Sequence, residues 1–260
     1  MVHRPIPNGI LCITQPAHAV VSAQLSRYWG NDLFGSLTPN EDMQLAAYLH
    51  DIGWIEWENR PTLNPTTGYP YNFMELPRRD HLHIWQIATD MVRPFSRYAA
   101  LLTSRHGIML YNMVDESLEE TADLPLIAAY RQKEAQIQAD LLHQLSQEDG
   151  YQQAIIPENL ARNSRLLAVW DWLSLLLCQQ ITQPKSVSNV PVKNGKQTLM
   201  LTPITADSET IRLTPWPFSV DQLTIQVNGR VLQNSCTNNQ EMRHALQTAS
   251  WQQLAIHLVA

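Results

Sequence analysis

The sequence has few cysteines, no long apolar run and little charge. Its 260 residues include three scattered cysteines that form no Cys-x-x-Cys pair, so we expect no disulfide framework and interpret the thiols as inert. No apolar stretch approaches the roughly 20 residues that a membrane helix needs. Prolines also interrupt the N-terminal segment where a signal peptide would have its apolar core. These absences predict a cytoplasmic protein that does not enter a membrane.

Basic residues are also scarce: the chain has 18 Lys and Arg against 24 Asp and Glu, which gives a net charge of −6. Without a basic stripe, nucleic acid is not expected as a partner. No Walker loop, Gly-x-Ser-x-Gly or Gly-x-Gly-x-x-Gly motif is present. We therefore expect a small-molecule substrate, and we leave a homodimer open.

Apolar residues make up 44% of the chain, which is ample for a core. Their spacing predicts helices, with Thr38 as N-cap of the second and Pro39 at its first position. Residues 58–80 contain several prolines and predict a long loop, which is either a lid or a surface insertion. The predicted helices cover residues 16–30, 39–53, 81–92, 97–106, 124–147 and 158–181.

The pattern changes after Pro184. Residues 185–197 predict a linker, whereas 197–204, 209–218 and 222–232 alternate apolar and polar side chains as strands do. Asn228 and Gly229 are a candidate tight turn. We therefore predict a mainly α protein, with a helical domain at 1–183 and a small β-rich subdomain at 184–260 packed on it.

The dipeptide His50-Asp51 ends a predicted apolar helix, in LAAYLHDIGW. Adjacent helical residues project about 100° apart, so both side chains reach one metal only near a helix end or with ligands from other helices. His18 and His106 lie on two other predicted helices. Taken alone, His18 is a satisfied core histidine and His106 a helix-capping cation.

Asp171 lies in the apolar run LLAVWDWLSLLL, with leucines at 167 and 175 instead of a cation one turn away. Burying a carboxylate without a partner costs on the order of several kcal/mol, because the ion loses its hydration. Asp171 therefore binds a metal, forms an ion pair with a distant Arg or Lys, or is exposed. We favour the metal.

The order of His18, His50-Asp51 and Asp171 resembles the HD superfamily of metal-dependent phosphohydrolases. The resemblance implies an HD-domain helical bundle and a divalent metal held by these four residues. Members with two metals have two further histidines, for which His106 and either His81 or His83 are candidates. We prefer His81, whose helix face should point inward. HDIGWIEWE, NPTTGYPYNF and AALLTSRHG also resemble an uncharacterised bacterial family within this group.

The resemblance implies hydrolysis of a small phosphoester or nucleotide at one or two metals, with iron or manganese preferred. Asp51 would be shared by two metals, and Arg105, Arg78 or Arg79 would clamp the phosphate. Trp54 replaces the lysine that often follows the HD pair, which puts conventional phosphate handling in question. Two alternatives stay open: a di-iron oxygenase of the same superfamily and a metal-binding protein without catalysis.

Overall fold

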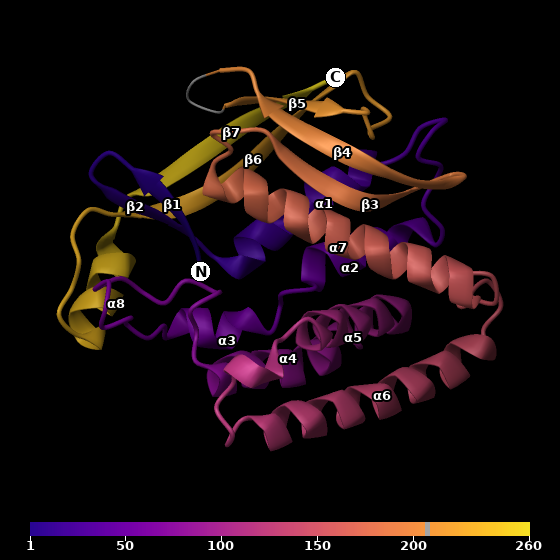
Figure 1. Ribbon diagram of the computed structural model, residues 1–260, viewed down its shortest axis with the longest axis horizontal. Coiled ribbons are helices and arrows are strands. Elements are labelled where there is room, and N and C mark those ends of the chain that lie inside the picture. The colour runs from indigo at the N-terminus through magenta and orange to yellow at the C-terminus, as the bar shows by residue number, and fades with distance from the viewer. Residues whose placement is uncertain (206–208) are drawn as a thin grey trace.

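The computed structural model in Figure 1 describes residues 1–205 and 209–260. Helices form 46% of the chain and strands 22%. The helices are α1 (Gln15–Tyr28), α2 (Asn40–Leu49), α3 (Trp54–Asn59), α4 (Arg78–Val92), α5 (Arg97–Asn112), the 3-10 turn η1 (Glu116–Leu118), α6 (Leu124–Ser146), α7 (Pro157–Gln179) and α8 (Asn239–Thr248). The strands are β1 (Val2–Ile6), β2 (Gly9–Ile13), β3 (Lys185–Val192), β4 (Gly195–Pro203), β5 (Thr210–Thr214), β6 (Gln222–Leu232) and β7 (Trp251–Val259).

The expectation of a mainly α, all-helical HD bundle is wrong. The seven strands form one mixed sheet in the order β1-β2-β6-β7-β5-β4-β3, and this sheet curls into a half-barrel. Figure 1 shows the sheet as a layer above the helices, with α1 and α7 beneath it and α4, α5 and α6 farther away. The sheet is thus a main layer of the fold. The division of the chain at residue 183 stays a prediction.

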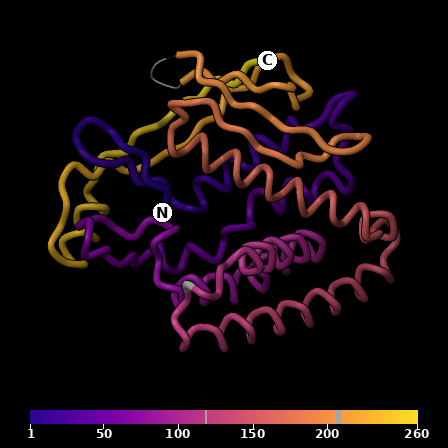
Figure 2. Tube along the Cα trace, viewed as in Figure 1, coloured from indigo at the N-terminus to yellow at the C-terminus, as the bar shows by residue number. Residues whose placement is uncertain are grey.

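The N-terminal residues belong to this sheet. β1 and β2 form an antiparallel hairpin, and Leu11 of β2 aligns with Val231 of β6. Figure 2 shows the indigo hairpin beside the yellow C-terminal strands. Pairing between segments more than 200 residues apart depends on tertiary packing, which local alternation of side chains does not encode. The sequence therefore predicted the later strands but not their pairing with the first.

Helix α7 connects the sheet to the helical layer. It contacts β1 and β3 on one side and α1, α2 and α5 on the other. A helix covered in this way is apolar around its circumference, which explains the run of leucines. Trp170 is fully buried, whereas Trp172 is 47% exposed. None of the helices in residues 1–205 and 209–260 is long and apolar enough to cross a membrane.

Three local predictions were wrong. Residues 185–192 form β3 instead of a linker. Asn228 and Gly229 lie within β6, where a Cβ on Gly229 would be 2.7 Å from Leu11 Cγ, so close strand packing and not a turn explains the glycine. Helix α2 has Pro39 as its N-cap and no side-chain capping bond, so Thr38 does not cap it.

Candidate metal centre

Four of the predicted ligands meet inside the helical layer. His18, His50, Asp51 and Asp171 each offer a nitrogen or oxygen atom, and these atoms all lie within 4.8 Å of one another. They come from α1, the end of α2 and α7, which contact each other pairwise. Residues from distant parts of the chain thus converge on one point, as the resemblance implied. That they ligate a metal stays a prediction.

His50 is the C-cap of α2, and Asp51 begins the turn that follows. His50 keeps helical dihedrals (φ −55°, ψ −30°), so its side chain and that of Asp51 project about 100° apart and meet at one point only because α1 and α7 pack against this helix end. His50 Nε2 therefore lies 3.7 Å from Asp51 Oδ2 and 3.4 Å from Asp171 Oδ1. The helix end thus brings both members of the pair toward Asp171.

A hydrogen-bond chain fixes the imidazole of His18. Ser174 Oγ donates to the carbonyl of Asp171 at 2.7 Å, so its oxygen accepts from His18 Nδ1 at 2.6 Å. Ser22 Oγ donates to the same Ser174 oxygen at 3.0 Å. His18 Nε2 lies 2.6 Å from Asp51 Oδ2, so with Nδ1 already protonated this contact needs a second proton, on Nε2 or on Asp51, or a metal ion that both atoms bind. Histidines that bind metals are commonly oriented by such a bond from the second ring nitrogen.

His50 is oriented in a similar way. Its Nδ1 donates to the carbonyl of Ala47 at 2.9 Å, and its buried Nε2 has no hydrogen-bond partner. Buried polar atoms are almost always bonded. The unpartnered Nε2, close to two carboxylates, is thus the atom that a metal ion would satisfy.

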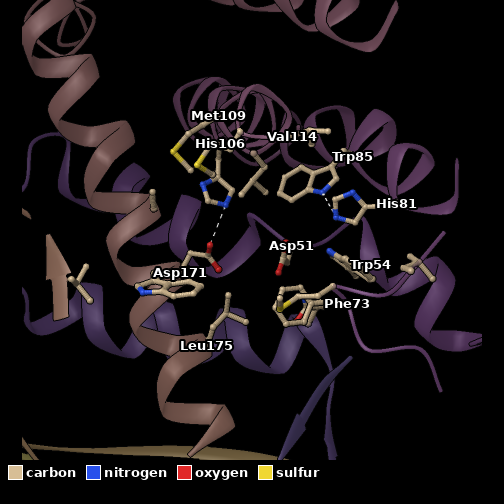
Figure 3. Close-up of a pocket in the computed structure, with 18 of the residues that line it drawn as sticks. Asp51, Trp54, Phe73, His81, Trp85, His106, Met109, Val114, Asp171 and Leu175 are labelled. Atoms are coloured by element: carbon tan, nitrogen blue, oxygen red, sulfur yellow. Dashed lines mark hydrogen bonds and ion pairs between the residues drawn. The ribbon is translucent and has the colours of Figure 1, made fainter. Parts of the chain in front are cut away.

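The side chain of Asp171 is 13% exposed, and its ion-pair contacts in the described chain are histidines. Oδ2 lies 3.4 Å from His106 Nε2, the contact drawn in Figure 3. The structure therefore places no Arg or Lys against Asp171 among the described residues and leaves it little exposed. His106 stands beside the four-residue group and not within it.

Charge is concentrated at this point. Burial alone would raise the pKa of Asp171, but the imidazoles of His106 and His50, whose Nε2 atoms each lie 3.4 Å from one of its carboxylate oxygens, outweigh it and lower that pKa. Burial would likewise lower the pKa of His50, yet Asp51 and Asp171 raise it to about 9. The carboxylates thus favour positive charge between them, which a proton or a metal ion supplies.

The two remaining histidine candidates, His81 and His83, differ in their distance from the cavity. His81 on α4 borders the same cavity as Asp51, and its Nδ1 lies 2.6 Å from Tyr111 Oη. Trp85 Nε1 donates to His81 Nε2 at 3.3 Å. The side chain of His83 is 58% exposed and lies 3.7 Å from Glu56. The structure thus brings His81 close to the site, engaged with aromatic neighbours, and leaves His83 outside it.

A cavity of about 700 Å³ opens on the centre and is lined by Asp51, His106 and Asp171. Arg105 does not line it, and its Nε donates to Ser164. Arg79 pairs with Asp123, also away from the cavity. Arg78 borders it. Of the arginines expected to clamp a phosphate, the structure thus brings Arg78 alone to the cavity.

The donor set fits a transition metal. Imidazole nitrogen with carboxylate oxygen suits iron, manganese, nickel or zinc, whereas calcium and magnesium prefer oxygen ligands alone. One unpartnered nitrogen, His50 Nε2, is buried beside both carboxylates. The side chains therefore fit a divalent transition metal, although they do not identify it.

Sequence reasoning missed the two serines that support His18. Ser22 and Ser174 are fully buried and bonded to each other. Ser174 follows Asp171 by three residues in an otherwise apolar helix, so it lies on the same helix face. That spacing was the available signal. Arg165, which also lines the cavity, had no distinguishing pattern.

Comparison with known proteins gives one match. No curated protein and no solved structure matches the chain. A family model described as "Protein of unknown function (DUF3891)" matches residues 1–234. The match carries no activity and no link to the HD superfamily, so the predicted resemblance is confirmed only at the level of an uncharacterised family. The chain belongs to the family of unknown function DUF3891.

Proposed function

We propose that this protein is a metal-dependent hydrolase of a small phosphoester. One divalent transition metal, iron or manganese, is held by the four-residue group His18, His50, Asp51 and Asp171. The observation that carries this proposal is the position of the group. Its carboxylates border a cavity of about 700 Å³, so a ligand in the cavity reaches the metal position.

A metal ion held by these four residues would supply Lewis-acid polarisation of a phosphoryl oxygen. Water adds to phosphorus, the P–O bond to the leaving alcohol breaks, and the protons of the water end on that alcohol and on the released phosphate. The residues of this chain hold the metal and orient the ester. His106 contacts Asp171 and lines the cavity, which positions it to pass a proton to the leaving oxygen.

A relationship of the site to the HD superfamily is part of this proposal. Its support is the order of ligands along the chain, with His18 on α1, His50-Asp51 at the end of α2, His106 on α5 and Asp171 on α7. A second metal near Asp51, His81 and His106 stays a prediction. The comparison with the HD superfamily concerns only the helices that hold these residues, and the half-barrel sheet is not part of it.

The experiment measures release of inorganic phosphate from phosphomonoesters, and of the leaving alcohol from phosphodiesters, by protein loaded with Mn²⁺ or Fe²⁺. Asp51→Asn should lose activity, since Asp51 touches both the metal group and the cavity. Glu120→Gln, an equivalent change at an exposed position, is the control. A folded, metal-loaded protein that cleaves no ester of the panel contradicts the proposal.

Oxidation with O₂ is a second candidate, favoured by the aromatic side chains of Trp54 and Trp85 around the cavity. Both are buried, so they shield a reactive centre from bulk water. Oxygen uptake by the iron-loaded protein, measured beside phosphate release, separates the two functions. Uptake without phosphate release favours oxidation.

A further inference from the structure

The walls of the cavity that opens on the metal centre are mainly apolar. Figure 3 shows Phe73 and Leu175 on the side of Asp171 and Asp51, with Met109 and Val114 opposite. Leu76 and Leu110 extend this surface. Asp51, His106 and Asp171 supply polar groups where the cavity meets the metal centre, and Arg165, Ser186 and Ser188 also line it. A pocket with an apolar body and polar groups at one end binds ligands of matching polarity.

The rim of the cavity carries large apolar side chains that face solvent. Met74 is 74% exposed, Met113 67% and Trp172 47%. They come from the loop before α4, the end of α5 and the middle of α7, and all three line this cavity. Single exposed apolar residues are ordinary, but a group around one opening marks a binding surface. Methionines adapt to ligands of different shape.

Positive charge in the cavity is limited. Within the described chain its lining includes two arginines, Arg78 and Arg165, and no lysine. Arg78 donates to both carboxylate oxygens of Glu119, at 2.8 and 2.5 Å, so its charge is already balanced. Arg165 donates to the carbonyls of Ser188 and Asn189, which leave its charge unneutralised. A ligand with several phosphates needs more cations than this.

We propose that the substrate of this site has one anionic ester group on an apolar, aromatic or branched aliphatic body, unlike a nucleotide or a polyphosphate. This inference rests on the proposed function. The ester group lies at the metal centre, where Asp51, His106 and Asp171 border the cavity. The apolar body of the substrate occupies the space between α4, α5 and α7. Its far end extends to the rim that is formed by Met74, Met113 and Trp172.

The test is calorimetric binding of three non-hydrolysable probes to the full Mn²⁺-loaded chain. Methylphosphonate has the anionic group alone, 1-naphthylmethylphosphonate adds an aromatic body, and a nucleoside 5′-phosphonate adds a polar one. Burial of the naphthyl ring should tighten binding at least about tenfold over methylphosphonate. The nucleoside probe should stay close to methylphosphonate. A naphthyl probe bound no better than methylphosphonate, or a nucleoside probe bound more tightly, overturns the inference.

A pair of rim variants locates the body of the ligand. Met74→Glu and Met113→Glu place a carboxylate at exposed positions, so folding should be kept. Each variant should weaken binding of the naphthyl probe several-fold and leave binding of methylphosphonate unchanged. Phe95→Glu, at a residue that is 62% exposed and outside this cavity, is the matched control. Equal losses for all three variants, or none, contradict the assigned position.

Failure of the proposed hydrolysis gives a different result. If no ester releases phosphate but the naphthyl probe keeps its advantage, hydrolysis is wrong and the ligand class stands. If esters are cleaved at equal rates whatever their body, and the probes bind equally, the ligand class alone is wrong. The unmodified protein suffices for both measurements, so the conclusion does not depend on the variants.

Discussion

His18 Nε2 lies 2.6 Å from Asp51 Oδ2, and the two side chains are only 1% and 5% exposed. One residue is on α1 and the other follows α2, so the contact links two helices at the centre of the helical layer. Burying a carboxylate among imidazoles is costly unless positive charge neutralises it. We therefore interpret the arrangement as a site in which a metal ion would balance the negative charge.

Asp171→Asn should lower the metal affinity at least about tenfold, because it removes a charged ligand while nearly keeping the shape of the side chain. Metal per chain after dialysis against a weak chelator measures this. Asn163→Asp would be a poor control because Asn163 is buried; Asn159→Asp, at an exposed position of the same helix, is suitable. Unchanged metal content in Asp171→Asn would remove Asp171 from the site.

Ser174→Ala should weaken metal binding about 10- to 100-fold without removing any ligand. The change deletes the hydroxyl that accepts from His18 Nδ1, so the imidazole loses the bond that fixes its tautomer. Ser164→Ala on the same helix removes a hydroxyl that bonds Arg105 instead, and it should leave the affinity unchanged. Titration with Mn²⁺ compares the two variants. Equal affinities would show that the serine has no orienting role.

His81→Ala should reduce phosphate release, since His81 lines the cavity, whereas His83→Ala should leave it unaffected. The ratio kcat/KM and the metal content of each variant are the measurements. Loss of one of two metals in His81→Ala alone would identify His81 as a ligand of a second ion. A larger loss of activity in His83→Ala would contradict the present assignment.

Glu134 gives a pH-dependent prediction away from the metal. It is fully buried on α6, and burial raises its pKa above the ordinary 4.5. The folded state thus holds this proton more tightly than the unfolded state does. Its contribution to stability is complete below about pH 4.5 and is lost as the pH rises through the raised pKa.

Glu134→Gln should therefore stabilise the protein above that pH, by an amount on the order of 1 kcal/mol. The amide remains uncharged, and it can still accept from Thr89 Oγ1, which lies 3.0 Å from Glu134 Oε2. Urea unfolding at pH 5 and pH 8 measures the change, with Glu120→Gln as an exposed control. A variant that is less stable at pH 8 would show that Glu134 is ionised and stabilising.

The helical part of the fold was predictable because its information is local. Helix α6 was expected at 124–147 and runs from Leu124 to Ser146, since its apolar residues recur with helical spacing. Strand β3 was missed because a bulge breaks its alternation, so that Val187 and Val190, three residues apart, are both buried. Strand order was also out of reach, since it depends on contacts between distant segments.

The candidate site divides in the same way. Asp171 was selected from the sequence because a carboxylate in an apolar helix is costly to bury unpaired. His18, His50 and Asp51 were selected because their order along the chain with Asp171 resembles the HD pattern. Their convergence needed the structure. The engagement of Arg105 with Ser164, and of Ser174 with His18, depends on which helix faces meet, and no local pattern shows that.

Elemental analysis of the full chain, purified without chelators or metal-affinity steps and then reconstituted with Fe²⁺ or Mn²⁺, tests the central claim most directly. The protein should hold at least about one transition metal per chain, lost in Asp171→Asn and kept in His83→Ala. Protein that is folded but holds no iron or manganese after reconstitution would contradict the metal centre, and with it the proposed hydrolysis.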